Sequence, residues 1–357
     1  MVQRMSNDTL RIALPSKGRI EEGTRLFFEH VGFPVRRPNA RQYVGSLRGV
    51  PQVSVLFQRA SDIVTKVESG LADVGITGLD FVAEHQGESG AVIVLMPDLG
   101  FSRCRFVIEV PEAWVDITTI ADLADLAADF RARGRTLRVI TDSPNLVKDF
   151  LYAHGVTYFV VIEGEGGLEA APAIDTADIV ADRTETGTTL RDNRLKEVEG
   201  GTIMETQACL IGNRDELRES PAKREQLRHI MEFAEAHLRS RRFRTLTANV
   251  RGESAADVAA HVIQRVETAG TLGPTVAPVF PKTPSARTAP VITALETGWY
   301  AVSIVVEEHL LLPAIDHLRR AGSGGITVGA PEYVFEPASR AYVAMLEALG
   351  LPNEAAQ

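Results

Sequence analysis

Residues 177–190 read ADIVADRTETGTTL and say more about the fold of this chain than any other segment. Its first part, ADIVAD, is an apolar run that ends in a carboxylate, Asp182, and is typical of a buried strand. The Gly/Thr turn that follows leads into a helical pattern. A strand, a turn and a helix in this order bring unpaired backbone N–H groups, hydroxyls and the positive end of a helix dipole to one point. The stretch therefore indicates a phosphate-binding turn in an α/β fold.

An ordinary turn capped by threonines, with no ligand, is the alternative interpretation of these residues. The stretch matches neither the Lys-bearing loop GxxxxGK[ST] nor the fingerprint GxGxxG. The rest of the chain must decide between the two.

On both sides of this stretch, short Val/Ile-rich runs alternate with helical patterns, which predicts α/β lobes. The runs before the segment DLGFSRC are LRIAL, VSVLF, ADVGIT and AVIVLM, and those after it are RFVIEV, LRVIT, YFVVIE and ADIVAD. The extended run EVEGGTIMETQACLIGN is expected to cross back to the first lobe. A ligand would then lie between two lobes joined by two crossings.

The remaining sequence predicts a domain with a different plan. From RTLTANV to GGITVGAP, strand and helix patterns follow the order βαββαβ, that of a ferredoxin-like domain. A long helix precedes it, opened by Ser220 and Pro221. The Pro/Thr-rich stretch 281–298 is expected to form a loop or extended excursion.

Composition limits the classes of function. The 357 residues predict two or three domains, and no apolar window reaches the roughly 18 residues that span a bilayer. A net charge of −9 argues against a large nucleic-acid interface. The first residues lack the apolar core of a secretory signal, and Cys104 and Cys209 both lie in apolar runs. We therefore expect a cytoplasmic protein that contacts neither membrane nor nucleic acid.

Basic residues follow two of the predicted strands. Lys17 and Arg19 flank Gly18 after the first, and Arg59 follows VSVLFQ. Because ligands of open α/β sheets bind at the carboxyl ends of strands, these residues indicate an anion site. Solvated surface cations without a partner are the alternative.

Two further segments combine glycine with a carboxylate. Gly78, Leu79 and Asp80 end a strand, where glycine would admit a ligand to the backbone and the carboxylate would accept from hydroxyls or an amine. In GEGGLEAAP, Glu169 could orient a substrate hydroxyl. A plain turn, or an acid that favours a helix start, is the alternative for both.

The motifs of covalent and metal-centred catalysis are missing from the sequence. There is no Cys/His cluster with zinc spacing and no GxSxG elbow. This favours chemistry by positioning and electrostatics, with a metal carried by substrate phosphates.

Taken in order, several segments closely resemble the ATP phosphoribosyltransferase of histidine biosynthesis, through about the first 215 residues. They are LRIALPSKGRI, RASDIVTKVESGLADVGITGLD, DLGFSRCRF, GEGGLEAAP, ADIVADRTETGTTLRDNRLKEVE and TQACLIGN. The tail resembles the long-form branch of that family. The resemblance implies an α/β fold with a two-lobed, periplasmic-binding-protein-like catalytic core and a C-terminal ferredoxin-like, ACT-like regulatory domain. We expect residues 1–102 and 190–222 in the first lobe, 103–189 in the second and 223–357 in the regulatory domain.

The resemblance also implies an activity: with Mg²⁺, the N1 nitrogen of ATP displaces pyrophosphate from 5-phosphoribosyl-1-pyrophosphate (PRPP). The residues expected to bind PRPP are Asp182, Thr184, Glu185, Thr186, Gly187, Thr188, Thr189 and Leu190. Those expected on the ATP side are Lys17, Gly18, Arg19, Arg59, Gly78, Leu79 and Asp80. Direct roles in catalysis are expected for Lys17, Arg19, Glu169 and Asp182. The side chain of Glu185 is expected to point outward while its backbone N–H serves the anion.

Regulation is implied in the same way. The long form is a hexamer built from dimers and is inhibited by histidine bound to the C-terminal domain, where Thr275 falls in the comparable region. Two other classes of function remain open. One is a solute-binding or ligand-sensing module with the same two lobes, and the other is a phosphoribosyltransferase that acts on another base.

Overall fold

The computed structural model describes residues 8–39, 41–85, 90–265, 268, 270, 273–279 and 298–352. The chain divides into two compact units, each described here by itself. The first unit extends to Met231 and resumes at Arg340, and the second spans Glu232–Ser339. Among the described residues, no helix combines the length and the apolar composition that a membrane-spanning segment requires.

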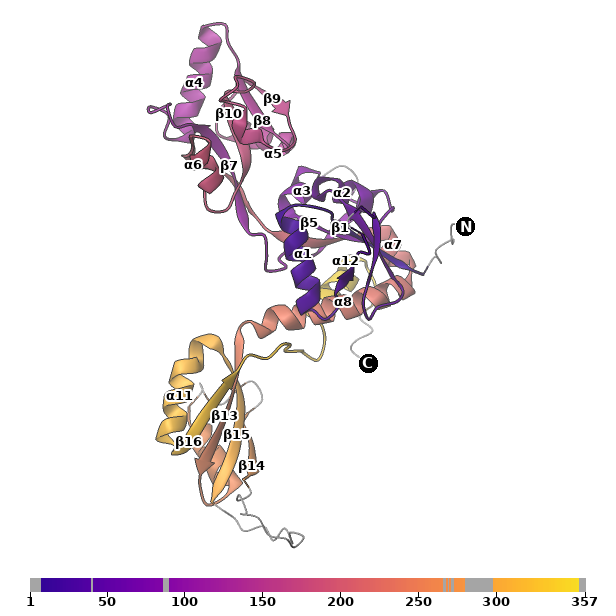
Figure 1. Cartoon of the computed structure of the whole chain (residues 1–357), viewed down its shortest axis with the longest axis vertical. Helices are drawn as coiled ribbons and strands as arrows, with labels where there is room; N and C mark the ends of the chain where they lie inside the picture. The colour runs from indigo at the N-terminus through magenta and orange to yellow at the C-terminus, as the bar shows by residue number, and fades with distance from the viewer. Residues whose placement is uncertain are drawn as a thin grey trace. The chain divides into compact units, whose positions relative to one another are not determined.

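The first lobe of the first unit is built on a seven-stranded sheet with the order β2-β3-β4-β1-β5-β12-β6. Central strand β1 is parallel to β4 and β5, and β12 is antiparallel to both β5 and β6. The strands are β1 (Leu10–Pro15), β2 (Val35–Arg36), β3 (Val44–Leu47), β4 (Val53–Gln58), β5 (Val74–Gly78), β6 (Val92–Met96) and β12 (Ala208–Asn213). The helices are α1 (Arg19–His30), α2 (Ala60–Glu68), α3 (Leu79–Glu84) and α7 (Arg214–Glu219). Figure 1 shows α1, α2 and α3 beside β1 and β5.

The second lobe is built on a five-stranded sheet with the order β11-β7-β10-β8-β9. Strands β10, β8 and β9 are parallel, whereas β7 is antiparallel to β10 and to β11. The strands are β7 (Cys104–Pro111), β8 (Leu137–Thr141), β9 (Phe159–Glu163), β10 (Ile179–Thr184) and β11 (Leu195–Thr206). The helices are α4 (Ile120–Ala132), α5 (Pro144–Ala153), the 3₁₀ turn η1 (Leu168–Ala170) and α6 (Thr188–Asp192).

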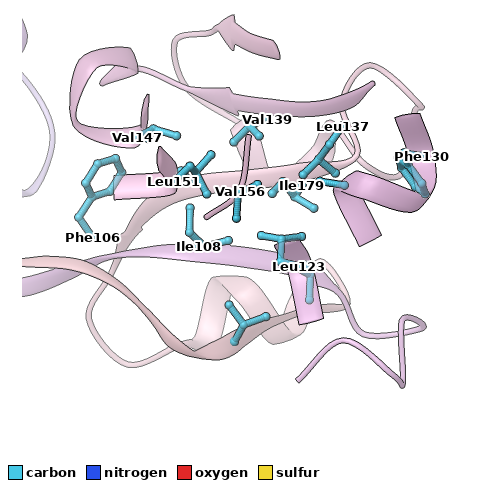
Figure 2. Close-up of a cluster of buried hydrophobic side chains, with 14 residues drawn as sticks. Phe106, Ile108, Leu123, Phe130, Leu137, Val139, Val147, Leu151, Val156 and Ile179 are labelled. Atoms are coloured by element: carbon cyan, nitrogen blue, oxygen red, sulfur yellow. The ribbon is translucent and has the colours of Figure 1, made fainter. Parts of the chain in front are cut away.

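Side chains alternate along each strand, so the two faces of this second sheet pack against different elements. One face carries Ile108 and Ile179 and packs with α4 and α5 in the apolar core of Figure 2, where the labelled side chains point toward one another. The other face carries Val180, which packs with Leu168 of η1 and Leu190 of α6. We call this second face the loop face, because it is covered by the helix that follows the Gly/Thr turn.

The eight strands predicted for the two lobes are present, and the predicted crossing back to the first sheet is confirmed, with β11 in one sheet and β12 in the other. The short β2–β3 hairpin was not predicted. The boundary expected at residue 190 differs from the structure, because β11 pairs with β7 and so keeps residues 195–206 in the second lobe.

The second unit has the predicted βαββαβ order, and its four strands form an antiparallel sheet in the order β14-β15-β13-β16. This is the ferredoxin-like arrangement. The elements are β13 (Phe243–Arg251), α9 (Ala255–Val262), β14 (Thr275–Pro278), β15 (Trp299–Glu307), η2 (Glu308–Leu310), α11 (Leu311–Arg320) and β16 (Ser323–Gly329). Its core is a separate apolar cluster that includes Val258, Val302 and Leu318. The predicted excursion at 281–298 lies, except for Gly298, outside the described residues.

The expected boundaries of the third domain, 223–357, are wrong at both ends. The beginning of α8 (Pro221–Ser240) belongs to the first unit, where buried Lys223 contacts Asp73 at 2.9 Å. The helix α12 (Arg340–Ala348) returns to the first unit, where it contacts β6. There Arg214 of α7 donates a hydrogen bond of 2.7 Å to the carbonyl of Ala348. Both contacts join segments too far apart in sequence for a local pattern to reveal them.

Candidate functional site

The predicted strand, turn and helix are present at the Gly/Thr turn. β10 ends at Thr184, and Gly187 precedes the first residue of α6 in the left-handed conformation, with φ 70° and ψ 12°. The backbone N–H of Gly187 donates to the Thr184 hydroxyl at 3.0 Å, and the hydroxyls of Thr186 and Thr188 share a hydrogen bond of 2.9 Å. A left-handed residue at this point explains the glycine, because other residues are strained there.

The loop residues differ in what they can offer a ligand. Thr186, Thr188 and Thr189 are exposed, so their hydroxyls are accessible. Thr184 is buried, and its hydroxyl accepts the hydrogen bond from Gly187 within the turn. Leu190 is buried in the apolar cluster on the loop face. The PRPP contacts expected of these last two residues can therefore come only from their backbone.

Asp182 and Glu169 lie near each other beside this turn. Asp182 is the second residue before the end of β10, and Glu169 is in η1, after Gly166 and Gly167, which have φ of 70° and 65°. Burial raises the pKa of Asp182 to about 6; the backbone N–H and the charge of Arg183 oppose the rise, and the charge of Glu169 adds to it. Two carboxylates on one side of a phosphate loop suit the hydroxyls of a sugar, which donate to them.

The turn between β1 and α1 meets the phosphate loop. Lys17, Gly18 and Arg19 are exposed, and Gly18 precedes the first residue of α1 with φ 81°. The Arg19 guanidinium contacts the Glu185 carboxylate at 2.5 Å. The Glu185 side chain is 54% exposed, as the predicted outward orientation requires, but it is paired with a cation of the other lobe.

A second ion pair joins the lobes in the same way. Arg59, just before α2, pairs with Glu165 in the glycine-rich segment that leads to η1. Two of the three basic residues predicted at strand ends, Arg19 and Arg59, therefore each form an ion pair with a carboxylate of the second lobe.

The Gly78 to Asp80 turn is arranged differently from the expectation. Asp80 is buried, its Oδ1 accepts from the Thr206 hydroxyl at 2.7 Å, and its Oδ2 accepts from the guanidinium of Arg183. A Cβ atom at Gly78 would lie 2.3 Å from Asp80 Oδ1. Glycine is therefore needed here to make room for the Asp80 side chain, and Asp80 is not the open acceptor that the sequence predicted.

Arg183 is a site residue that the sequence analysis missed. Its side chain is 14% exposed and donates to both oxygens of Asp142, at 2.6 and 2.8 Å, besides Asp80. The guanidinium also lies 4.2 Å from the centre of the Phe81 ring. Burial lowers the pKa of Arg183, but the charges of Asp80 and Asp142 outweigh it and raise the pKa overall. The sequence signal that could have identified Arg183 is its position: it is a charged residue next to the end of an apolar strand.

Glu84 was also missed. It is buried at the end of α3 in the first lobe, and its carboxylate accepts from the backbone N–H groups of Asn145 and Leu146, each at 2.9 Å. These groups open α5 of the second lobe, where a negative charge is favoured by the helix dipole. No local pattern in the sequence pointed to this contact.

A hollow of about 480 Å³ lies where the chain crosses between the two lobes. Its lining includes Glu185 of the phosphate loop together with Asp98, Arg103, Cys104, Arg105, Glu205, Thr206 and Gln207. Within the described ranges, no group of three or more His, Cys, Asp or Glu side chains is placed to hold a metal ion. Thr275, the expected effector residue, is exposed at the start of edge strand β14 in the second unit.

Two family models match the chain. The model described as ATP phosphoribosyltransferase matches residues 59–235, and the model described as HisG, C-terminal domain, matches residues 240–330. ATP phosphoribosyltransferase 1, chloroplastic, from Arabidopsis thaliana is 33% identical over 97% of this chain and 82% of its own length. ATP phosphoribosyltransferase from Brucella melitensis is 42% identical over 58% of this chain and 90% of its own length.

Solved structures are similar at a lower level. A chain of the ATP phosphoribosyl transferase (HisG:HisZ) complex from Thermotoga maritima superposes with a TM-score of 0.49 at 22% identity, covering 63% of this chain and 96% of that one.

Proposed function

The chain belongs to the ATP phosphoribosyltransferase family, and on that premise we propose how its residues carry out the reaction. The observation that carries the function is the match to the Arabidopsis relative, which extends over 97% of the chain. The enzyme transfers the phosphoribosyl group of PRPP to ATP in the first step of histidine biosynthesis. The N1 nitrogen of adenine forms a bond to the anomeric carbon as the bond from that carbon to pyrophosphate breaks.

The phosphate loop binds the 5-phosphate of PRPP. Support comes from the left-handed Gly187 and from the exposed hydroxyls of Thr186, Thr188 and Thr189. Backbone N–H groups in such a turn are donors that need no reorganisation when the anion arrives. The carboxylates of Asp182 and Glu169 then accept from the ribose hydroxyls, which places the anomeric carbon toward the first lobe.

The cations of the first lobe bind the nucleotide and the pyrophosphate. ATP and PRPP are both polyanions that repel each other, so positive charge is needed where they meet. Arg19 and Arg59 pair with Glu185 and Glu165. Exposed ion pairs of this kind contribute only about 0–1 kcal/mol, so a phosphate with its larger charge displaces the carboxylate easily. Lys17 adds a third positive charge beside Arg19.

Asp80 and Arg183 hold this arrangement together instead of contacting ATP directly. Arg183 binds Asp80 from the first lobe and Asp142 from the second, so it fixes α3 against the strand that carries Asp182. Correct orientation of the two substrates is worth up to roughly 7–11 kcal/mol in favourable reactions, and no protein nucleophile is required.

Mg²⁺ enters with the substrates. Since no described group of three or more His, Cys, Asp or Glu side chains is placed for a metal, the phosphate oxygens of PRPP are the ligands that fit. When bound there, the ion stabilises the negative charge of the departing pyrophosphate.

The second unit is proposed to bind histidine as a feedback inhibitor and to assemble the chain into a hexamer. Its separate core and its match to the C-terminal family model support a domain with a task of its own. A reducing, cytoplasm-like compartment is proposed because both cysteines, Cys104 and Cys209, are free thiols.

The test is an assay of the purified chain with ATP, PRPP, Mg²⁺ and a pyrophosphatase that removes the product pyrophosphate. Formation of the phosphoribosyl-ATP chromophore is expected. Product from another base but not from ATP would indicate a different phosphoribosyltransferase. Binding of a ligand without any product would favour a solute-binding module.

A further inference from the structure

Glu109 is a buried acid in the second lobe that the mechanism above does not use. It lies in β7, between β11 and β10, and is 1% exposed. Its Oε2 atom is buried and has no hydrogen-bond partner among the described residues. A buried polar atom without a partner is costly, and where it persists it needs an explanation.

The strand register places Glu109 on the loop face. It is directly opposite Val180 of β10 and Glu197 of β11, and Asp182 is the next residue along β10 on the same face. Val180 packs with Leu168, which adjoins Glu169 in η1. Glu109 therefore lies in the sheet beneath the turn and η1, the two segments assigned to PRPP.

The charged groups that act on Glu109 are all acids. They are Asp182 of β10, Glu169 of η1 and Glu197 of β11. The nearby cation, Arg105, is committed to Glu197 through two hydrogen bonds of 2.5 and 2.8 Å. Burial, and after it these three negative charges, raise the pKa of Glu109 to about 8. At neutral pH the side chain is therefore a neutral acid, and it brings an O–H donor to a group of carboxylates that can only accept.

We propose that Glu109 is a positioning residue of the phosphoribosyl site, whose buried carboxyl group supports Asp182 and Glu169 from beneath so that both can accept from the ribose hydroxyls of PRPP. The inference rests on the proposed function, because it takes the binding of PRPP at this face as given. Glu109 touches neither substrate and acts through the two carboxylates above it.

A dependence on pH follows from this placement. Below about pH 8 Glu109 is uncharged and does not repel Asp182, Glu169 or the 5-phosphate. Above that pH Glu109 becomes a fourth negative charge in this group, and it is buried in the sheet beneath the anion site. The affinity for PRPP should therefore fall as the pH rises through about 8, and the fall should belong to this one residue.

The test compares the wild-type chain with Glu109→Gln by calorimetric titration of PRPP and Mg²⁺, without ATP, from pH 6.5 to 9.5. Glutamine keeps a donor at this position and cannot ionise. We expect similar affinities at pH 7. Between pH 7 and 9 the wild type should lose about tenfold more affinity than the variant, the order of magnitude expected for one negative charge near an anion in a partly buried site. Glu112→Gln, an exposed glutamate just beyond β7, is the matched control and should keep the wild-type pH profile.

A second variant separates positioning from space filling. Glu109→Met has a similar volume and no donor, so it should weaken PRPP binding already at pH 7 and show the flat profile of Glu109→Gln. Identical pH profiles for the wild type and Glu109→Gln would overturn the inference, as would wild-type affinity of Glu109→Met at pH 7. A wild-type chain that makes no phosphoribosyl-ATP in the assay above would instead refute the proposed function, so the two failures are distinguishable.

Discussion

At the scale of single residues, the phosphate loop depends on one backbone conformation. Gly187 has φ 70°, and a Cβ atom there would lie 3.2 Å from a guanidinium nitrogen of Arg191. A branched side chain at such a φ is strained, and here it would also press against the Arg191 side chain beside the turn that is assigned to the phosphate.

Gly187→Val is therefore expected to abolish measurable PRPP binding and to reduce the free energy of unfolding by about 1–3 kcal/mol. Calorimetry with PRPP and urea denaturation measure the two effects. Gly134→Val is the matched control: Gly134 has φ 72° with open space around its Cβ position, so the variant should lose comparable stability and keep its PRPP affinity. Unchanged PRPP affinity in Gly187→Val would refute the assignment of the loop.

A second prediction concerns the exposed pair between Arg19 and Glu185. Glu185→Gln releases the Arg19 guanidinium, so substrate phosphates no longer compete with a carboxylate for it. The apparent affinity for the substrate that binds Arg19 should rise by a factor of about 1.4 to 5, in line with the roughly 0.2–1 kcal/mol that exposed ion pairs contribute. Steady-state KM values for ATP and PRPP at low ionic strength measure the change.

Glu22→Gln, an exposed acid of α1, is the control for the lost negative charge. It should leave both KM values near those of the wild type. If Glu185→Gln weakened both substrates instead, Glu185 would be a ligand-binding residue and not a placeholder for phosphate.

At the scale of elements, the first sheet and α8 are joined through one buried carboxylate. Asp73 is fully buried just before β5, accepts from the backbone N–H of Arg11 at 2.7 Å and from the Lys223 ammonium at 2.9 Å. Burial alone would raise the pKa of Asp73, but the hydrogen bonds from Arg11 and Lys223 lower it overall. β1, β5 and the beginning of α8 therefore share one electrostatic centre.

Asp73→Asn is expected to reduce the free energy of unfolding at pH 7 by about 3 kcal/mol, because the buried Lys223 ammonium then keeps only the partly exposed Glu216 as an anion. A lowered pKa in the folded state means that the carboxylate contributes its full stabilisation above its ordinary pKa of about 4, and that this contribution is lost progressively as the pH falls from about 4 through the lower pKa of the folded state. The difference between wild type and variant should therefore shrink as the pH falls below about 4.

Urea denaturation at pH 7 and pH 3.5 measures this prediction. Asp149→Asn, at an exposed position of α5, is the control, and it should change stability by about 0.5 kcal/mol or less at pH 7. A gap between wild type and Asp73→Asn that persisted unchanged at pH 3.5 would show that charge is not the cause.

The sequence anticipated most elements, including the strand, turn and helix of the phosphate loop, for identifiable reasons. β10, the turn at Gly187 and α6 follow from apolar periodicity and turn chemistry, which are local properties. The β2–β3 hairpin and α12 escaped prediction because the first is very short and the second is stabilised by distant β6. Asp80 was assigned to ATP because nothing local indicates that Arg183, 103 residues away, occupies its carboxylate.

At the scale of the whole molecule, the chain returns from the second unit to the first. The hydroxyl of Ser339 donates to Glu235 at 2.6 Å, so the segments that enter and leave the second unit lie side by side. The second unit can therefore be removed while α12 and the buried end of α8 are kept.

Replacing residues 237–338 by a short Gly/Ser linker should leave a folded core that still forms phosphoribosyl-ATP and is insensitive to histidine. Light scattering should show a smaller assembly than that of the full chain. The reason is that the first unit keeps Lys223 and α12, whereas the proposed effector domain is gone.

Truncation at residue 223, by contrast, should destabilise the core, because it removes Lys223 and α12 together. Inhibition of the linker variant by histidine would place the effector site in the first unit.

Local sequence patterns were enough to predict the alternation of strands and helices, the Gly/Thr turn that precedes α6 and the βαββαβ order of the second unit, because each of these follows from a few neighbouring residues. Only the tertiary structure decided which charges meet. The pairs of Arg183 with Asp80 and of Arg19 with Glu185, and the burial of Glu109 among acids, depend on strand order and on the approach of distant segments. Coulomb energies and desolvation act through space, so the electrostatics of the site follow from the fold and not from any local stretch of the sequence.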